Sequence, residues 1–235
     1  MLKKRMMLLL TLSFAILLSG CMTPSDDNAG STIPYEDQLE LVQKAVERFQ
    51  EGSGGLLPIK TREMETDIYI KYPIDFTKII PAYTEKIPSN AYEKGGIFQY
   101  VLIDVETNPT VKLVDLRSAE RIRELNLRKS VAGSISYKDP VGEGVYEIDF
   151  AEMGFKKPLT VESPYSDAHL PLVVGGDGKF YIDYSIDLNR ILQEEKPDVV
   201  QGEDIRYLLA DKYPVLPAYS KAYTVNELNE PIFIK

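Results

Sequence analysis

The sequence is poor in the side chains on which many sites depend. It has one cysteine, one histidine and no tryptophan among 235 residues. A single cysteine excludes an internal disulfide, and a single histidine excludes zinc sites that need two imidazoles. The sequence also lacks a Gly-Lys-Ser/Thr phosphate loop and a Gly-x-Ser-x-Gly nucleophile elbow. We therefore expect no catalytic residues, no metal site and no cofactor, and we expect that the protein is not an enzyme.

Positive charge is also in short supply. There are 27 Lys and Arg residues against 36 Asp and Glu residues, which gives a net charge of −9. Such a chain is a poor partner for nucleic acid, because the phosphate backbone attracts basic surfaces. Hydrophobic residues make up 44% of the sequence, which is typical of a folded, globular chain.

The N-terminus has the pattern of a bacterial lipoprotein signal. Lys3, Lys4 and Arg5 precede an apolar run over residues 6–18, which is too short to cross a bilayer. The run ends in a lipobox, formed by Leu18, Ser19, Gly20 and Cys21. We expect residues 1–20 to be removed and Cys21 to carry lipid chains, which would anchor the protein at the outer face of the cytoplasmic membrane after general export. Residues 21–33 have the composition of a flexible tether.

The first part of the remaining chain, 34–235, predicts helices around an antiparallel hairpin. A helix begins near residues 34–37, carries an apolar stripe and ends at the glycines of 52–55. Asp75 is a candidate cap for a short helix. Residues 97–105 and 111–116 read as two strands joined by a turn, and Ser118 is expected to begin a charged helix.

The second part repeats this organisation loosely. Strands are predicted over 144–150, 170–174 and 179–186, with helices from Asp187 and over 203–212, and an edge strand at 231–234. The prediction is an α+β fold in which amphipathic helices pack on antiparallel hairpins. Two related α+β units, with halves at 34–130 and 131–235, and one antiparallel sheet with helices remain alternatives.

A few polar residues are candidates for chemistry. Asp104 and Glu106 lie two apart at a strand end, where two carboxylates could act as acid and base or could form a solvated rim. His169 is the only imidazole and follows the polar loop 163–167, where a ligand would first be sought.

Tyrosine is the main aromatic residue, with fifteen copies. Its ring and hydroxyl suit the binding of glycans or proteins. The prolines of segment 213–223 favour an exposed, extended chain, so Tyr219 and Tyr223 join Tyr165 and His169 as candidate contacts with a ligand or partner.

The sequence resembles the YphF type of uncharacterised lipoproteins from spore-forming Gram-positive bacteria. The resemblance rests on the lipobox and on the stretches 54–61 (GGLLPIKT) and 90–96 (NAYEKGG). The resemblance implies attachment to the membrane, but it does not indicate any enzymatic reaction. The chain is also faintly similar to the head domains of pilins and pseudopilins, although these keep the apolar helix that cleavage before Cys21 would remove.

These observations lead to an expected function. The protein should be a membrane-anchored, extracytoplasmic lipoprotein that binds a protein or cell-wall partner without catalysis, with the bilayer as a second partner through Cys21. The first alternative is the solute-binding lipoprotein of an ABC importer. The second is an envelope hydrolase that uses Asp104 or Glu106.

Overall fold

The computed structural model describes residues 35–234. The predicted signal peptide, lipobox and tether, including Leu18, Ser19, Gly20 and Cys21, lie outside the described residues. The helices are α2 (Tyr35–Gly52), η1 (Ile68–Ile70), α3 (Phe76–Ile79), η2 (Tyr92–Lys94), α4 (Leu116–Ala132), α5 (Ser185–Glu195) and α6 (Tyr207–Lys212). The strands are β1 (Tyr72–Pro73), β2 (Phe98–Ile103), β3 (Thr110–Asp115), β4 (Tyr137–Gly142), β5 (Val145–Ile148), β6 (Thr160–Glu162), β7 (His169–Gly175), β8 (Phe180–Ile182), β9 (Tyr223–Val225) and β10 (Pro231–Phe233).

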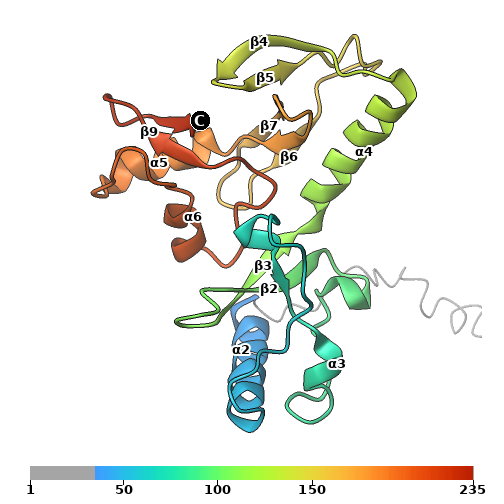
Figure 1. Ribbon diagram of the computed structural model, residues 1–235, viewed down its shortest axis with the longest axis vertical. Helices are drawn as coiled ribbons and strands as arrows, with labels where there is room; N and C mark the ends of the chain where they lie inside the picture. The colour runs from blue at the N-terminus through green and yellow to red at the C-terminus, as the bar shows by residue number, and fades with distance from the viewer. Residues whose placement is uncertain (1–34, 235) are drawn as a thin grey trace, which may run out of the picture. The chain divides into compact units, whose positions relative to one another are not determined.

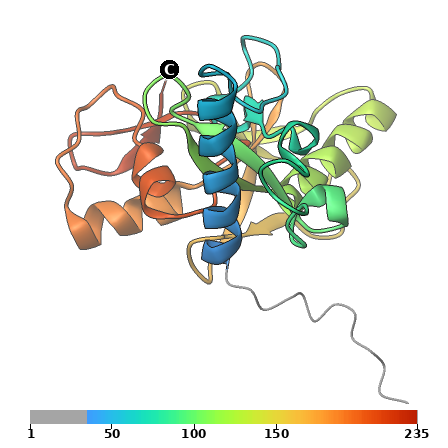
Figure 2. The same cartoon turned by 90° about the horizontal axis from the view of Figure 1, so that it is seen from below.

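The first sheet has the order β1-β2-β3 and is covered by α2. The predicted hairpin is confirmed, since β2 and β3 pair antiparallel from Phe98 opposite Asp115 to Ile103 opposite Thr110. The predicted helix is confirmed too, and its apolar stripe is buried at Val42, Ala45 and Val46. Helix α2 lies across this sheet (Figure 2). Its spacing of three and four residues places the apolar side chains on one face, which the sheet buries.

Short capping contacts begin α3 and α4. Asp75 accepts a hydrogen bond from the backbone N–H of Thr77, so the predicted cap is confirmed. Asp115 accepts one from the N–H of Arg117 and starts α4 two residues before the expected Ser118. In Figure 1, α4 runs from β3 toward β4.

The segment after α6 returns to the first sheet. The N–H of Leu113 donates to the carbonyl of Pro214, and the N–H of Leu216 donates to the carbonyl of Leu113, so residues 214–216 lie parallel to β3. Leu216 and Ala218 are consequently buried. The prediction of an exposed, extended segment at 213–223 is therefore wrong, because residues 214–216 pair with β3 and residues 215–218 are buried.

The second sheet has the order β4-β5-β7-β6, with β8 also paired to β7. The predicted strands at 144–150 and 170–174 correspond to β5 and β7. The predicted edge strand at 231–234 forms as β10, paired with β9. Helix α5 packs against this part through Leu188, Ile191 and Leu192.

The predicted strand over 179–186 is too long. Strand β8 ends at Ile182, and Ile186 belongs to α5, where its side chain is exposed. The Asp183 carboxylate accepts a hydrogen bond from the N–H of Ser185, which turns the chain into the helix. Strands β4 and β6 were not predicted, because β4 contains Pro140 and is exposed along almost its whole length.

Helices and antiparallel strands together confirm the α+β class. Every pairing between named strands in residues 35–234 is antiparallel. One hydrophobic core surrounds the first sheet and α2, and another surrounds the second sheet and α5. A smaller cluster with Val101, Val114 and Leu216 lies where the returning segment meets β2 and β3. Within the described residues, no helix has both the length and the apolarity required to cross a membrane.

Candidate functional site

A cleft of about 380 Å³ is the candidate site. Three segments that are distant in sequence surround it: residues 68–72, the β2–β3 loop and α6. Its lining consists of Ile68, Tyr69, Tyr72, Ile103, Asp104, Val105, Glu106, Thr107, Tyr207, Ala210 and Asp211. This volume lies at the lower end of the range for small-ligand pockets.

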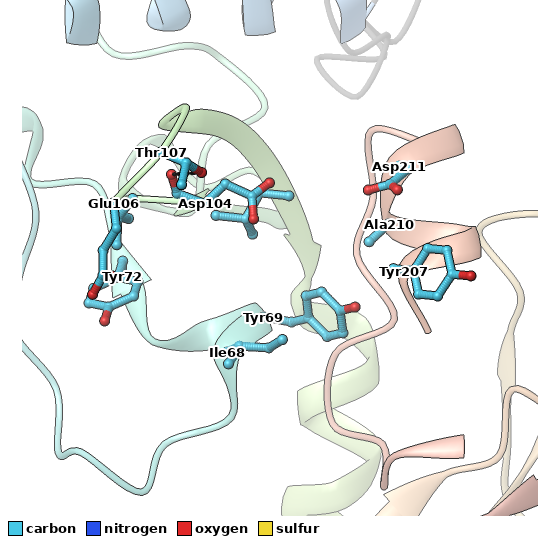
Figure 3. A pocket seen from close by; sticks show the side chains of 11 residues that line it. Ile68, Tyr69, Tyr72, Asp104, Glu106, Thr107, Tyr207, Ala210 and Asp211 are labelled. Carbon is cyan, nitrogen blue, oxygen red and sulfur yellow. Dashed lines mark hydrogen bonds between the residues drawn. The ribbon is translucent and has the colours of Figure 1, made fainter. Parts of the chain in front are cut away.

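Carboxylates lie on two sides of the cleft. Asp104 and Glu106 come from the β2–β3 loop, and Asp211 comes from α6 on the opposite side (Figure 3). Within residues 35–234, no ion pair joins any of these three carboxylates to a basic side chain. The cleft therefore carries negative charge that no direct ion pair offsets.

Lys112 is a basic residue near Asp104 and Asp211, but its ammonium group is hydrogen-bonded to backbone carbonyls and not to these carboxylates. Its ammonium group donates hydrogen bonds to the carbonyls of Ala210 (2.6 Å) and Tyr213 (2.9 Å). Burial lowers the pKa of Lys112, although the charges of Asp211 and Asp104 oppose this shift. Lys112 thus holds the end of α6 next to β3 and contributes positive charge at a distance.

Tyrosine and aliphatic side chains form the rest of the lining. Ile68 is 57% exposed and Tyr207 is 38% exposed, so both offer apolar surface to a ligand. Tyr69 is only 5% exposed, and its hydroxyl points toward the side of the cleft formed by Tyr207 and Asp211 (Figure 3). In the described part of the chain, that hydroxyl makes no hydrogen bond, and its oxygen is not fully buried. Burial raises the pKa of Tyr69, so the phenol is neutral at physiological pH.

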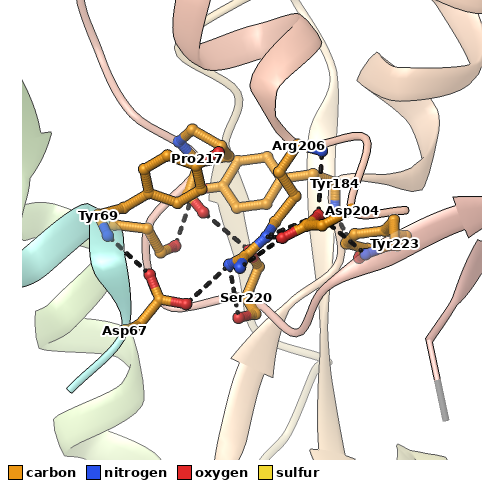
Figure 4. Close-up of polar contacts among 9 residues, drawn as sticks. Asp67, Tyr69, Tyr184, Asp204, Arg206, Pro217, Ser220 and Tyr223 are labelled. Carbon is orange, nitrogen blue, oxygen red and sulfur yellow. Dashed lines mark hydrogen bonds and ion pairs between the residues drawn. The ribbon is translucent and has the colours of Figure 1, made fainter. Parts of the chain in front are cut away.

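A buried arginine, Arg206, packs against the ring of Tyr69. The guanidinium of Arg206 lies 4.9 Å from the centre of the Tyr69 ring and pairs with Asp67 (2.9 Å) and Asp204 (2.8 Å). It also donates to the backbone carbonyl and the hydroxyl of Ser220 (Figure 4). Asp67 in turn accepts a hydrogen bond from the N–H of Tyr69. Arg206 therefore joins the segment that carries Tyr69 to the chain around α6.

His169 is exposed and lies at the start of β7, as its place after the polar loop predicts. It lines a second pocket of about 320 Å³, together with Asp115, Arg117, Arg121 and Glu162. Arg117 donates to both carboxylate oxygens of Asp115 and also forms an ion pair with Glu162. The charges of this pocket are thus largely paired, and the chain's only imidazole lies outside the acidic cleft.

The predicted tyrosine contacts do not form a surface. Tyr223 is fully buried and donates from its hydroxyl to Asp183 (2.8 Å). Tyr165 is buried against Tyr184 and Tyr213, and its hydroxyl donates to the carbonyl of Val215. Tyr219 is partly buried beside the second core. Tyr165 and Tyr223 are therefore corrected from candidate contacts to core residues.

The polar loop 163–167 is held by a buried carboxylate. Asp187 is fully buried and accepts hydrogen bonds from the hydroxyls of Ser163 (2.8 Å) and Ser166 (2.6 Å). The Ser163 oxygen accepts from the N–H groups of Tyr165 and Ser166. This network explains the polar composition of the loop without a ligand.

Asp104 and Glu106 are the predicted pair that the structure brings to the cleft. Sequence reasoning missed Asp211, Tyr69 and Tyr207, because no spacing relates α6 to a loop about a hundred residues earlier. Asp211 lies within the helix predicted over 203–212, but nothing in that helical pattern marks it as a site residue. Among residues 35–234, no group of three or more His, Cys, Asp or Glu side chains could hold a metal ion.

The comparisons with known proteins concern the first part of this structure. Residues 35–115 match the YphF family N-terminal domain. The YphF match runs from the first residue of α2 to the last residue of β3, so it includes two of the three segments around the cleft. It supports the resemblance to YphF-type proteins over that range. No curated protein and no solved structure matches the chain significantly, so the likeness to pilin heads stays a prediction.

Proposed function

We propose that the protein is an extracytoplasmic lipoprotein, anchored through Cys21, that acts as a non-catalytic binding module and receives its ligand or partner in the acidic cleft. The observation that carries the binding role is the cleft itself. It combines exposed apolar side chains with carboxylates that have no ion-pair partner in the described residues. The anchor rests on the lipobox.

The cleft lacks the imidazole that most general acid-base sites use, which favours binding over histidine-based catalysis. His169 lines a different pocket, and the residues around the cleft supply no serine or cysteine nucleophile. Solute-binding components of ABC importers need two doubly wound lobes with parallel strands. The named strands of residues 35–234 pair antiparallel, so their arrangement differs from that of these receptors.

The anchor is tested by labelling cells with palmitate. We expect the wild-type chain to incorporate the label and a Cys21→Ser variant not to incorporate it. A Cys21→Ser chain that is processed and retained at the membrane like the wild type would overturn the proposed anchor.

The binding role is tested with a fluorophore at the mouth of the cleft. Thr107→Cys places a thiol on the β2–β3 loop, and Lys138→Cys places one on β4 as a matched control. The native Cys21 would be acylated, so the wild-type chain serves as the labelling blank. We expect a cell-envelope fraction to change the fluorescence at position 107 and not at 138. If no fraction does so, the proposed binding role is wrong.

One observation favours a second candidate function, the carboxylate-dependent hydrolase. Asp104 and Glu106 line the same cleft, and such a mechanism requires two carboxylates that face one substrate. Turnover of envelope glycans by the purified protein, abolished by Asp104→Asn, would replace the non-catalytic proposal with this one.

A further inference from the structure

We propose that the cleft binds a primary alkylammonium group, the chemistry shared by a lysine side chain and a free diamine. The inference rests on the proposed function, since it assigns a ligand class to the same cleft. Charge, an unused hydrogen-bonding group and apolar surface support it separately.

The negative charge of the cleft favours a cationic ligand. Asp104, Glu106 and Asp211 face the cleft from two sides and have no ion-pair partner within residues 35–234. Lys112 is too far to form an ion pair with them, and its ammonium group is bound to two backbone carbonyls. A ligand with positive charge would therefore gain attraction that the folded chain itself leaves unused.

The Tyr69 hydroxyl is the second, independent observation. Tyr69 is 5% exposed, yet its hydroxyl makes no hydrogen bond in the described part of the chain and points into the cleft (Figure 3). The oxygen is not among the fully buried, unpartnered atoms of the described residues, so it is accessible from the cleft and can accept a hydrogen bond from a ligand. A neutral phenol oxygen can accept an N–H from an ammonium group.

The shape of the acceptor set favours an ammonium group over other cations. Its acceptors come from three segments: the β2–β3 loop, α6 and η1. An ammonium group has three donors that can point in different directions, whereas a planar guanidinium prefers one carboxylate in a two-pronged contact. A metal ion is disfavoured, because no group of three or more His, Cys, Asp or Glu side chains in the described residues could hold one, whereas an ammonium group can be bound through one or two acceptors.

The apolar side chains of the cleft provide a surface for the alkyl chain of such a ligand. Ile68, Ala210 and Tyr207 also line the cleft, and Ile68 and Tyr207 are exposed. Methylene groups gain free energy when they leave water for such a surface. A tyrosine ring also attracts an ammonium group that lies over its face.

The test is calorimetric titration of the full chain with two amines, 1,5-diaminopentane and trilysine. The control ligands are 1,5-pentanediol, which has the stem without charge, and trilysine with acetylated side chains and N-terminus. We expect at least one of the amines to bind, and neither control to bind. Binding of the diamine would identify a free amine as the source, and binding of trilysine alone would identify a lysine side chain. If neither amine binds, or if a control ligand binds equally well, the inference is wrong.

Carboxylate variants localise the binding. Asp211→Asn and Asp104→Asn should each weaken binding about tenfold, because each removes one charge from the cleft. Asp139→Asn removes the same charge from β4, which lies outside the cleft, and should leave binding unchanged. Equal weakening in all three variants would indicate a general charge effect and would overturn the assigned site.

Tyr69→Phe separates binding from folding. The hydroxyl makes no hydrogen bond within the described chain, so its loss should leave the melting temperature unchanged while binding weakens about fivefold. Unchanged binding would remove Tyr69 from the site. If both amines fail while an envelope fraction still changes the fluorescence at position 107, the ammonium assignment fails and the proposed binding role stands.

Discussion

Arg206 is the residue on which the arrangement around the cleft depends most directly. Its side chain is buried and lies between Asp67 and Asp204, with the Tyr69 ring against its face. Burial opposes the charge of Arg206, but hydrogen bonds and attraction from Asp204 and Asp67 outweigh it and raise its pKa. The guanidinium thus stays charged and holds Tyr69 at the cleft.

We predict that Arg206→Met lowers the free energy of unfolding by about 3–5 kcal/mol, because it leaves two carboxylates without their cation. Urea unfolding of the full chain measures this loss. Arg123→Met is the matched control: that arginine forms an exposed pair with Glu120 and should change stability by less than about 0.5 kcal/mol. Adding Asp67→Asn to Arg206→Met should restore part of the loss. A loss no larger than that of the control would contradict the role of Arg206.

Among the elements, β3 and α6 are joined by one side chain. Lys112 projects from β3 and donates to the carbonyls of Ala210 and Tyr213, near the end of α6. The last carbonyls of a helix lack partners within the helix, so an ammonium group there stabilises the helix end. This contact keeps Asp211 opposite Asp104.

We predict that Lys112→Met lowers the free energy of unfolding by about 1–3 kcal/mol, because it removes two hydrogen bonds in a partly buried place. Hydrogen exchange should become faster in α6 (Tyr207–Lys212) than in α5. Lys138→Met on the exposed strand β4 provides the control and should alter neither property. Unchanged exchange in α6 would show that the helix end does not need Lys112.

For the whole molecule, buried tyrosines set the limit of stability at high pH. Burial raises the pKa of Tyr100 to about 12, and it raises the pKa values of Tyr69, Tyr165, Tyr184 and Tyr223 as well. In the unfolded chain these phenols lose their protons near pH 10. The folded state retains them longer, so the stability that they contribute is complete below pH 10 and is lost as the pH rises.

We predict cooperative alkaline unfolding between about pH 11 and pH 12. Five such tyrosines would cost about 7 kcal/mol at pH 11, which is comparable with the total stability of about 5–15 kcal/mol. Circular dichroism should fall together with the rise in tyrosinate absorbance. Gradual ionisation of these tyrosines near pH 10 in a chain that keeps its circular dichroism would contradict the prediction.

The sequence pattern alone predicted those helices and strands whose determining residues lie close together in the chain. The helix at 35–52 follows from apolar spacing and the glycines after it, and the β2–β3 hairpin follows from two apolar runs around a turn. Asp75 was identified as a cap because its partner is two residues away. The sequence also carries the lipobox that predicts the anchor at Cys21.

Only the tertiary structure decided what the cleft contains and which tyrosines are buried. Asp211 and Asp104 line one cleft because the chain after α6 pairs with β3, and that pairing uses backbone groups that almost every residue possesses. That pairing also helps to bury residues 215–218, although the prolines at 214 and 217 predicted exposure, and Tyr223 is buried in the core of the second sheet. Side-chain spacing reports neighbours along one helix or strand, whereas contacts between distant segments depend on how complete surfaces fit together.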